Sequence, residues 1–398
     1  MKNDYLPAIH RCPINMKKIH IPRKVYIKAV ASFFILATLG SAAFFFIQVG
    51  EKWYDPVEIS RIEIGEQKLS DIEINEEDGL IYVTKFYRGF DIYNITDPTN
   101  PTRTAFHANL GELNQRIYYA DDRIFLSASR SLYIIDVSDP TSPERLGNFT
   151  TYESVQNVDV VGDILYLTTY NWFRVLDISN PANITILSSL QLHFGDHDVV
   201  VRDKIAFVAS NLDGLLIFNV TDPSNPHLIT KLWKYGTGVL YSVTRTKAVR
   251  LDGENLFVVD GVHGLVSFDI TNISSPVKRF KYVSGPPPDY FAIQDDIAYY
   301  PNSHSGVEIV DISDPENIVL RGTTRSRYLT SAVVMYGEIA ISISTEGVSL
   351  SEIVEGKGFN PWKLDIALDS LEGLWKGIGV ISIVSYLLYR VQKSDLLA

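Results

Sequence analysis

A nine-residue pattern ending in Asp-Pro or Asn-Pro recurs along most of the 398-residue chain. Copies begin at Leu132, Phe173, Leu215 and Val307, and the first reads Leu-Tyr-Ile-Ile-Asp-Val-Ser-Asp-Pro. An acidic or amide residue closes each apolar run: Asn94, Asp136, Asp177, Asn219, Asp269, Asp311 and Glu352. A second, mostly aromatic series runs in step with the first: Tyr82, Phe125, Tyr166, Phe207, Phe257, Tyr299 and Ile341. Both series have intervals of 41 to 43 residues apart from one of 50, which predicts seven repeats with an insertion in the fifth.

The composition of each repeat predicts four short strands. In the fourth repeat, strands are expected at 199–201, 205–209, 215–220 and 228–232, because these runs are rich in β-branched and aromatic residues and are separated by turn residues. No helical spacing of apolar residues persists between the turns. The Asp-Pro pieces are expected to be tight turns rather than sites of chemistry. A period of this length built from strands is typical of a propeller blade, so the sequence predicts an all-β, seven-bladed β-propeller of four-stranded blades over residues 57–355.

The seventh repeat supplies only three strands, since the Glu-Gly-Lys-Gly segment comes after residues 348–353 and no fourth strand follows it. Residues 57–64 match the outer strand of the other repeats and stand before the first complete repeat. The sequence therefore predicts that an N-terminal strand completes the seventh blade and leaves no open sheet edge.

The third strand of each repeat, with its trailing Ser-Asp-Pro turn, resembles the LVIVD-repeat propeller family. The closest copies lie at 132–136, 173–177, 215–219 and 307–311. The resemblance covers roughly residues 57–355. It implies a β-propeller on a bacterial or archaeal cell surface, in a family whose members mostly have no defined activity.

Two apolar segments predict attachment to a membrane. Residues 29–49 carry no charge over 21 positions, and residues 1–28 hold seven Lys or Arg against one acid. This asymmetry predicts a cytoplasmic basic segment, a transmembrane helix over 29–49 and an extracytoplasmic propeller. A cleaved signal peptide is the alternative, although the long basic region and the lack of a clear cleavage site favour an anchor.

The second apolar segment, 374–391, follows an expected linker over 356–373. It is interpreted as a further transmembrane helix that leaves a cytoplasmic tail over 392–398. Only 377–389 is free of charge, so a helix lying in the membrane interface is the alternative.

Charge and cysteine content agree with this placement at the cell membrane. The chain has a net charge of −11, of which residues 1–28 contribute +6 and the remainder −17. An acidic exterior domain is unsuited to nucleic acid. The one cysteine, Cys12, falls in the expected cytoplasmic segment, so no disulfides are expected outside.

Five Asn-x-Ser/Thr sequons occur in the chain. Asn94 and Asn219 stand where other repeats have Asp, so their sequons follow from the repeat pattern. Asn148, Asn183 and Asn272 are the expected acceptors if the protein is N-glycosylated.

The favoured ligand site of a propeller is the mouth of its central channel. Residues at the start of the inner strands, and in the loops between second and third strands, are the candidate binding residues: Arg116, Asn157, His193, His197, Asp198, Lys247, Tyr290 and His304. Their mixture of charge, amide and aromatic groups suits a sugar, a peptide or a small anion.

The densest group of potential metal ligands is the segment from His193 to Asp198, but Gly195 breaks the alternation of a strand and no second His pair or Cys set supports it. No metal or cofactor is expected. Gly-x-Ser-x-Gly, His-Glu-x-x-His and calcium-loop patterns are also absent from the sequence.

These features predict a membrane-anchored, non-catalytic binding or scaffolding module with a protein or glycan partner outside the cell. One alternative is a surface hydrolase or lyase that uses Arg116, His197, Asp198 and Tyr290 at the channel mouth. Another is a structural spacer in a surface layer or envelope complex.

Overall fold

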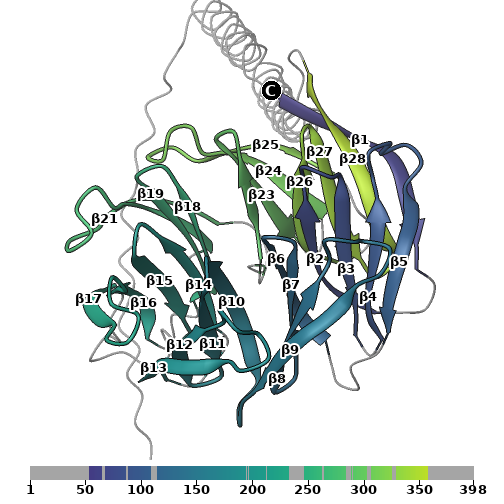
Figure 1. The fold of residues 1–398 in the computed structure, drawn as a ribbon. Coiled ribbons are helices and arrows are strands. Elements are labelled where there is room, and N and C mark those ends of the chain that lie inside the picture. The colour runs from purple at the N-terminus through teal and green to yellow at the C-terminus, as the bar shows by residue number, and fades with distance from the viewer. Residues whose placement is uncertain are drawn as a thin grey trace, which may run out of the picture. The chain divides into compact units, whose positions relative to one another are not determined.

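The computed structural model describes residues 53–356, apart from 65–67, 87, 109–113, 194, 196, 212, 233–245, 262–263, 284–287, 289, 303–305 and 325–328. These residues form seven four-stranded antiparallel sheets arranged in a ring (Figure 1). The fold confirms the predicted all-β, seven-bladed propeller of four-stranded blades.

Each of the first six blades runs in chain order from its inner to its outer strand. The first three blades are β2 (Leu69–Asn75), β3 (Leu80–Lys85), β4 (Gly89–Asn94) and β5 (Thr102–Ala108); β6 (Asn114–Ala120), β7 (Arg123–Ala128), β8 (Ser131–Asp136) and β9 (Glu144–Thr150); and β10 (Val155–Val161), β11 (Ile164–Thr169), β12 (Trp172–Asp177) and β13 (Thr185–Gln191). The next three are β14 (His197–Arg202), β15 (Ile205–Ser210), β16 (Gly214–Asn219) and β17 (His227–Leu232); β18 (Thr246–Asp252), β19 (Asn255–Asp260), β20 (Gly264–Asp269) and β21 (Val277–Tyr282); and β22 (Ala292–Gln294), β23 (Ile297–Asn302), β24 (Gly306–Asp311) and β25 (Val319–Thr323). The seventh sheet contains β26 (Thr330–Tyr336), β27 (Ile339–Ser344), β28 (Gly347–Gly356) and β1 (Trp53–Glu63).

The outer strand of the seventh sheet is β1, which pairs antiparallel with β28 from Trp53 opposite Gly356 to Glu63 opposite Gly347. The backbone of Gly347 has φ +138°, and an added Cβ there would overlap the carbonyl oxygen of Ile62. Because only glycine adopts this conformation readily, the position is matched to the close approach of β1.

The hydrophobic core lies between neighbouring sheets. Tyr82, Phe125, Phe207 and Phe257 of the aromatic series are at most 1% exposed. Tyr82 packs with residues of both the first and second blades in one apolar cluster. The second strands are therefore covered on both faces, which explains why their sequences are nearly continuous apolar runs.

The repeated turn after each third strand is a pair of side-chain-capped turns. Asp136 Oδ1 accepts hydrogen bonds from the backbone N–H and the hydroxyl of Ser138, at 2.8 and 2.6 Å. Asp139 Oδ1 accepts the same pair from Thr141, at 2.9 and 2.6 Å. The Asp, Asn, Ser and Thr residues of the repeat therefore serve local backbone bonding, as expected for Asx turns.

Both predicted membrane segments, 29–49 and 374–391, lie outside the described residues. Within the described part of the chain, no helix has the length and apolar character needed to span a membrane.

Candidate functional site

The inner strands are shaped so that their polar side chains meet near the ring axis. A β-bulge interrupts the pairing of the inner strand with the second strand near its start in five blades, at β2, β6, β10, β18 and β26. Bulges add a residue to one strand and redirect its side chains. Side chains from bulged and regular inner strands line one cavity.

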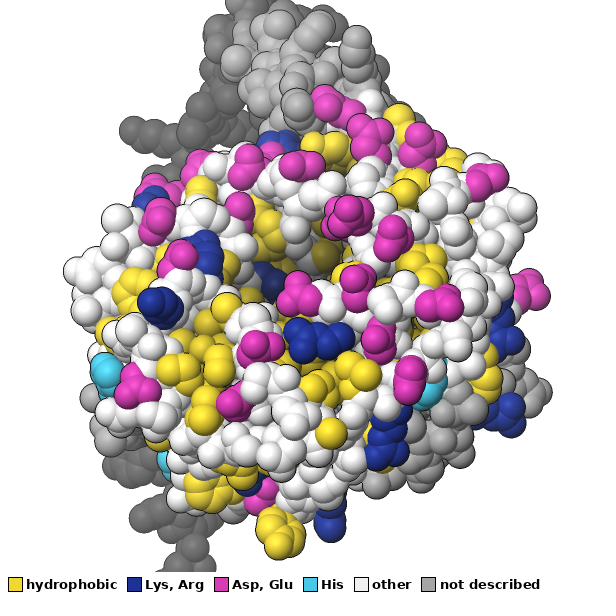
Figure 2. All heavy atoms as spheres, viewed as in Figure 1, with side chains coloured by type: hydrophobic (Ala, Val, Ile, Leu, Met, Phe, Trp, Pro, Cys, Tyr) yellow, Lys and Arg dark blue, Asp and Glu magenta, His cyan; other side chains and the backbone are white. Residues whose placement is uncertain are grey.

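The cavity has a volume of about 190 Å³. It is lined by Asp71, Glu73, Arg116, Ile117, Tyr118, Asn157, Val158, Asp159, Asp198, Val199, Val200, Arg250 and Tyr290. Figure 2 shows one face of the ring hollowed near its centre, with acidic and basic side chains around the hollow. A space of this size holds roughly six water molecules at their liquid volume. It is therefore suited to a ligand group the size of a side chain rather than to a large molecule.

Asp198 in β14 joins three successive blades. Its Oδ1 accepts from the Asn157 amide in β10 and from the Val199 N–H at 2.9 Å. Its Oδ2 accepts from the Val249 N–H and from Arg250 Nη1, each at 2.9 Å and both in β18. A carboxylate has about four acceptor positions, so this group is fully occupied while only 3% exposed.

Asp159 makes similar connections from the preceding blade. The Tyr118 hydroxyl of β6 donates to Asp159 Oδ1 at 2.7 Å, and the Val201 N–H of β14 donates to Oδ2 at 2.5 Å. The exposed backbone edge of an inner strand needs hydrogen-bond partners. Carboxylates from the preceding blade supply them here.

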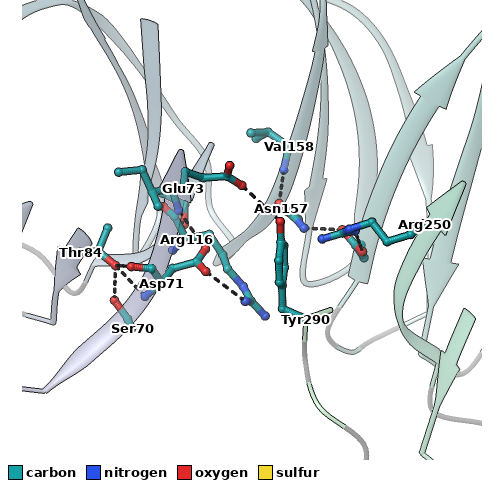
Figure 3. Close-up of polar contacts among 12 residues, drawn as sticks. Ser70, Asp71, Glu73, Thr84, Arg116, Asn157, Val158, Arg250 and Tyr290 are labelled. Atoms are coloured by element: carbon teal, nitrogen blue, oxygen red, sulfur yellow. Dashed lines mark hydrogen bonds and ion pairs between the residues drawn. The ribbon is translucent and has the colours of Figure 1, made fainter. Parts of the chain in front are cut away.

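The first blade differs, because one of its carboxylate oxygens accepts no hydrogen bond within the described residues. Asp71 Oδ2 accepts from the Ile117 N–H at 3.2 Å. Asp71 Oδ1 is buried and accepts no hydrogen bond within the described residues, and Arg116 Nη1 lies 4.0 Å from it. Glu73 Oε1 lies 3.5 Å from the Tyr290 hydroxyl. Figure 3 shows Asp71, Glu73 and Arg116 together on one side of the site and Tyr290 and Arg250 opposite.

The electrostatics of the cavity favour proton uptake by its carboxyls. Burial, and then the neighbouring charge of Asp71, raise the pKa of Glu73 to about 8. Burial also raises the pKa of Asp71, despite the lowering effect of Arg116. On the opposite side, the Arg250 guanidinium stacks on the Tyr290 ring at 4.2 Å from the ring centre.

Four of the eight candidate residues named from the sequence line this cavity: Arg116, Asn157, Asp198 and Tyr290. His193 lies elsewhere, with Nδ1 2.7 Å from Asp213 Oδ1, and Lys247 is not among the lining residues. The side chain of His197, and the whole of His304, lie outside the described residues.

The hydrolase alternative requires Asp198 to act on a ligand. Since the hydrogen bonds within the protein occupy both of its oxygens, Asp198 is unsuited to serve as a general base. Within the described part of the chain, no group of three His, Cys, Asp or Glu residues is arranged to hold a metal ion.

The sequence-based choice missed Asp71, Glu73, Tyr118, Asp159 and Arg250. The candidates at the start of the inner strands stand nine or ten residues before a member of the aromatic series. The missed residues Tyr118, Asp159 and Arg250 stand seven residues before such a member. In the first blade, a hairpin longer by two residues places Asp71 eleven residues before Tyr82, and Glu73, nine residues before Tyr82, belongs to a repeat for which no candidate was taken. Residues two apart on a strand share a face, so adding the positions seven residues before each member of the aromatic series would have found Tyr118, Asp159 and Arg250.

Of the five sequon asparagines, Asn94 and Asn219 cap the turn after the third strand, as expected from their place in the repeat. Asn94 Oδ1 and Asn219 Oδ1 accept from the backbone N–H of Thr96 and Thr221, each at 2.9 Å, as the repeat Asp residues do. The other three asparagines are exposed: Asn148, Asn183 and Asn272. Their glycosylation stays a prediction.

Comparison with known proteins agrees with the ring. LVIVD repeats match residues 127–151, 154–191, 196–232, 245–283 and 292–325, which lie in the second to sixth blades. No curated protein matches the sequence.

Solved structures with the same fold cover 75% of this chain. The computationally designed Ika8 protein matches over 100% of its own length, with 8% identity and a TM-score of 0.57. The β-propeller domain of Cps50 (Swd1) from Myceliophteria thermophila matches over 100%, with 10% identity and a TM-score of 0.59. Saccharomyces cerevisiae Sqt1 matches over 99%, with 9% identity and a TM-score of 0.54. At these identities the likeness concerns the fold alone. The five repeat matches, together with the seven four-stranded sheets, identify the chain as an LVIVD-repeat β-propeller protein.

Proposed function

We propose that this protein is a non-catalytic binding module, anchored in the cell membrane with its propeller outside, and that its ligand site is the central cavity. The observation that carries the proposal is the cavity of about 190 Å³ whose lining includes Asp71, a buried carboxylate with one oxygen that accepts no hydrogen bond within the described residues. Buried polar groups in a folded protein are normally satisfied, so an unsatisfied group in a cavity favours a ligand there.

The anchoring rests on the charge asymmetry about residues 29–49, with transmembrane helices over 29–49 and 374–391. The pairing of β1 with β28 supports ring closure by the N-terminal strand. A closed ring fits the role because a rigid scaffold keeps the inner strands in place without the ligand.

The binding proposal is tested by thermal unfolding of the full-length protein in mild detergent. A panel of small neutral sugars, carboxylates and alkylammonium ions is added, and a ligand at 100 times its Kd is expected to stabilise the native state by about 2.7 kcal/mol.

The site is checked with two matched substitutions. Val200→Phe fills the cavity, because Val200 lines it. Val161→Phe adds the same bulk at a side chain that is 51% exposed and is not among the cavity-lining residues. A ligand-induced rise in melting temperature that is lost in the first variant and kept in the second supports the proposal. No rise with any ligand, or a rise unaffected by Val200→Phe, counts against it.

The topology is tested with the single native cysteine. Cys12 is expected in the cytoplasm, whereas Tyr152 is 89% exposed on the propeller. In intact cells a membrane-impermeant thiol reagent should label a Tyr152→Cys, Cys12→Ser variant but not the native protein. Native Cys12 should react only after permeabilisation. Labelling of Cys12 in intact cells would contradict this orientation.

A further inference from the structure

Two equivalent carboxylates of the propeller are bonded very differently. Asp71 and Asp198 occupy the same position in their blades. The residue after each of them, Ile72 or Val199, pairs with the residue that directly follows a member of the aromatic series, Tyr82 or Phe207. Asp198 has four hydrogen-bond donors. Asp71 is just as buried, at 2% exposed, yet its Oδ1 has no donor within the described residues.

The difference arises from the neighbouring blade. Asp198 receives a hydrogen bond from Asn157, which stands nine residues before its aromatic marker in the preceding blade. The equivalent residue of the blade before Asp71 is Ala332, nine residues before Ile341. An alanine side chain has no donor, so Asp71 Oδ1 lacks the partner that its counterpart has.

The cation beside Asp71 does not replace that partner. Arg116 Nη1 remains 4.0 Å from Asp71 Oδ1, beyond hydrogen-bonding distance, and about a quarter of the Arg116 side chain is exposed. Arg250 is committed to Asp198 and to the Tyr290 ring. Asp71 Oδ1 therefore keeps an unfilled acceptor position in a residue that lines the cavity.

Glu73 adds a second acceptor next to this one. It stands two residues after Asp71 on β2, so both side chains project from the same face of the strand and both line the cavity. Its Oε1 accepts a long hydrogen bond from the Tyr290 hydroxyl, at 3.5 Å. Figure 3 shows the Glu73 carboxyl pointing toward Tyr290 across the site.

The balance of charge in the cavity is negative. Asp71, Glu73, Asp159 and Asp198 face two cations, Arg116 and Arg250. Asp159 and Asp198 are satisfied by hydrogen bonds between blades, whereas Asp71 keeps one oxygen, Oδ1, that accepts no hydrogen bond within the described residues.

We propose that Asp71 and Glu73 bind the cationic nitrogen of a small organic ligand, a primary ammonium group, within the central cavity. The inference rests on the proposed binding function and names its ligand class. An ammonium group has three donors and no acceptor, which matches two neighbouring carboxyl groups of which one has an oxygen that accepts no hydrogen bond within the described residues. The Tyr290 ring and the Val200 side chain line the same cavity and suit a short alkyl stem.

A divalent metal ion fits this site less well. Within the described residues no third acidic or imidazole ligand joins Asp71 and Glu73 as a metal-binding group. A small anion would meet an excess of carboxylates, with only Arg116 available to pair with it.

Binding of a cation should release a proton from Glu73. The groups that face it are Asp71 on its own strand, Tyr118, Arg250 and Tyr290. The strand packed on its other side, β26, brings Ala332 and Val334, neither of which titrates. Because the pKa of Glu73 is raised to about 8, it is largely protonated at about pH 6.5. An ammonium ligand favours the ionised carboxylate, so affinity rises with pH up to about 8 and then levels off.

The experiment uses butylammonium as the probe and isothermal titration calorimetry on the full-length protein in detergent. An alkylamine stays charged across this range, since its pKa resembles that of lysine, about 10.4. Release of one proton predicts an affinity roughly 20-fold higher at about pH 8.5 than at about pH 6.5. The neutral and anionic analogues, butanol and butyrate, are expected to show no binding.

Three variants locate the site. Glu73→Gln should weaken butylammonium binding at least tenfold at about pH 8.5 and abolish the pH dependence. Asp71→Asn should also weaken binding, and it should move the pH dependence to lower pH because the charge that raises the Glu73 pKa is gone. Glu77→Gln is the matched control, because Glu77 is exposed in the following hairpin and outside the cavity, and it should change neither property. The melting temperature of each variant without ligand establishes that it is folded.

The outcomes separate the two proposals. Preferential binding of butanol, butyrate or calcium, or unchanged butylammonium binding in Glu73→Gln, overturns the ammonium assignment. If another ligand class binds and Val200→Phe abolishes that binding, the binding function stands and only the assignment fails. If no ligand binds in the cavity, both fail.

Discussion

Replacing Asp198 by alanine should be among the most damaging single substitutions in the inner ring. The carboxylate is 3% exposed and connects three blades through the Asn157 amide, two backbone N–H groups and Arg250. Its removal leaves the Arg250 guanidinium without its carboxylate partner. It also leaves the Val249 N–H without an acceptor at the inner edge of the next blade.

The expected loss in the free energy of unfolding depends on the buried groups that are left without a partner, rather than on the number of hydrogen bonds lost. Removing one partner of a buried ion pair costs about 3–5 kcal/mol, and an unsatisfied buried N–H costs about 1–3 kcal/mol. These effects overlap because Arg250 keeps its stacking on Tyr290 and its bond to the Val249 carbonyl at 2.6 Å. We therefore expect a loss of about 4 kcal/mol in the free energy of unfolding, a large fraction of the ~5–15 kcal/mol typical of a domain.

The assay is urea unfolding of the full-length protein in detergent, in which the midpoint shifts and the slope with denaturant stays constant. The double variant Asp198→Ala, Arg250→Met removes both charges. It should be less destabilised than the sum of the single variants, by about 1–3 kcal/mol. A loss below about 1 kcal/mol in Asp198→Ala, or strict additivity in the double variant, would refute the argument that Asp198 balances a buried charge.

Three further outcomes are expected. Gly347→Ala should cost about 3 kcal/mol in a urea titration, because φ is +138° there and the added Cβ would overlap the carbonyl oxygen of Ile62. Gly337→Ala should cost only about 1 kcal/mol, because φ is +54° and no atom lies within 4 Å of the added Cβ. Equal losses would contradict the close packing of β1 against Gly347. Deleting residues 57–65 should give an unstable or aggregating protein, and a wild-type melting midpoint for the truncated chain would contradict closure by this strand. The Thr271 hydrogen bonds and Arg279 lower the pKa of Asp269 to about 2. The contribution of Asp269 to stability is therefore complete above about pH 4 and is lost as the pH falls toward 2. Asp269→Asn should reduce the pH dependence of the free energy of unfolding between about pH 4 and 2, and an unchanged slope would exclude this role.

The fold was predictable because two physical requirements recur with the same period. Each blade needs a bulky side chain at the centre of its second strand, such as Phe125, which is 1% exposed between sheets. Each also needs a side-chain cap after its third strand, such as Asp136, which holds Ser138. Both requirements are local to a blade, so they leave a regular trace in the sequence.

The site was only half predictable because its geometry depends on contacts between blades. Asn157 and Asp198 were found at the start of their strands, but their hydrogen bond joins residues 41 apart in sequence. The bulge near Asn157 at the start of β10 leaves no clear sequence signal. Arg250 was missed although it contacts Asp198, because it stands seven residues before Phe257 and the inner-strand candidates were taken nine or ten residues before each aromatic residue.

The inner ring nevertheless departs from the symmetry of the fold in an interpretable way. The backbone presents similar inner edges in every blade, so a purely structural solution could repeat from blade to blade. At the position seven residues before the marker, this chain has Tyr118, Asp159, Val200, Arg250, Ala292 and Val334 in the second to seventh blades. Polar and charged groups gather on one sector of the ring, while the sixth and seventh blades carry small apolar side chains. An irregular ring on a regular scaffold is expected where side chains are shaped for a ligand, since ligands lack sevenfold symmetry and stability alone would not require the variation.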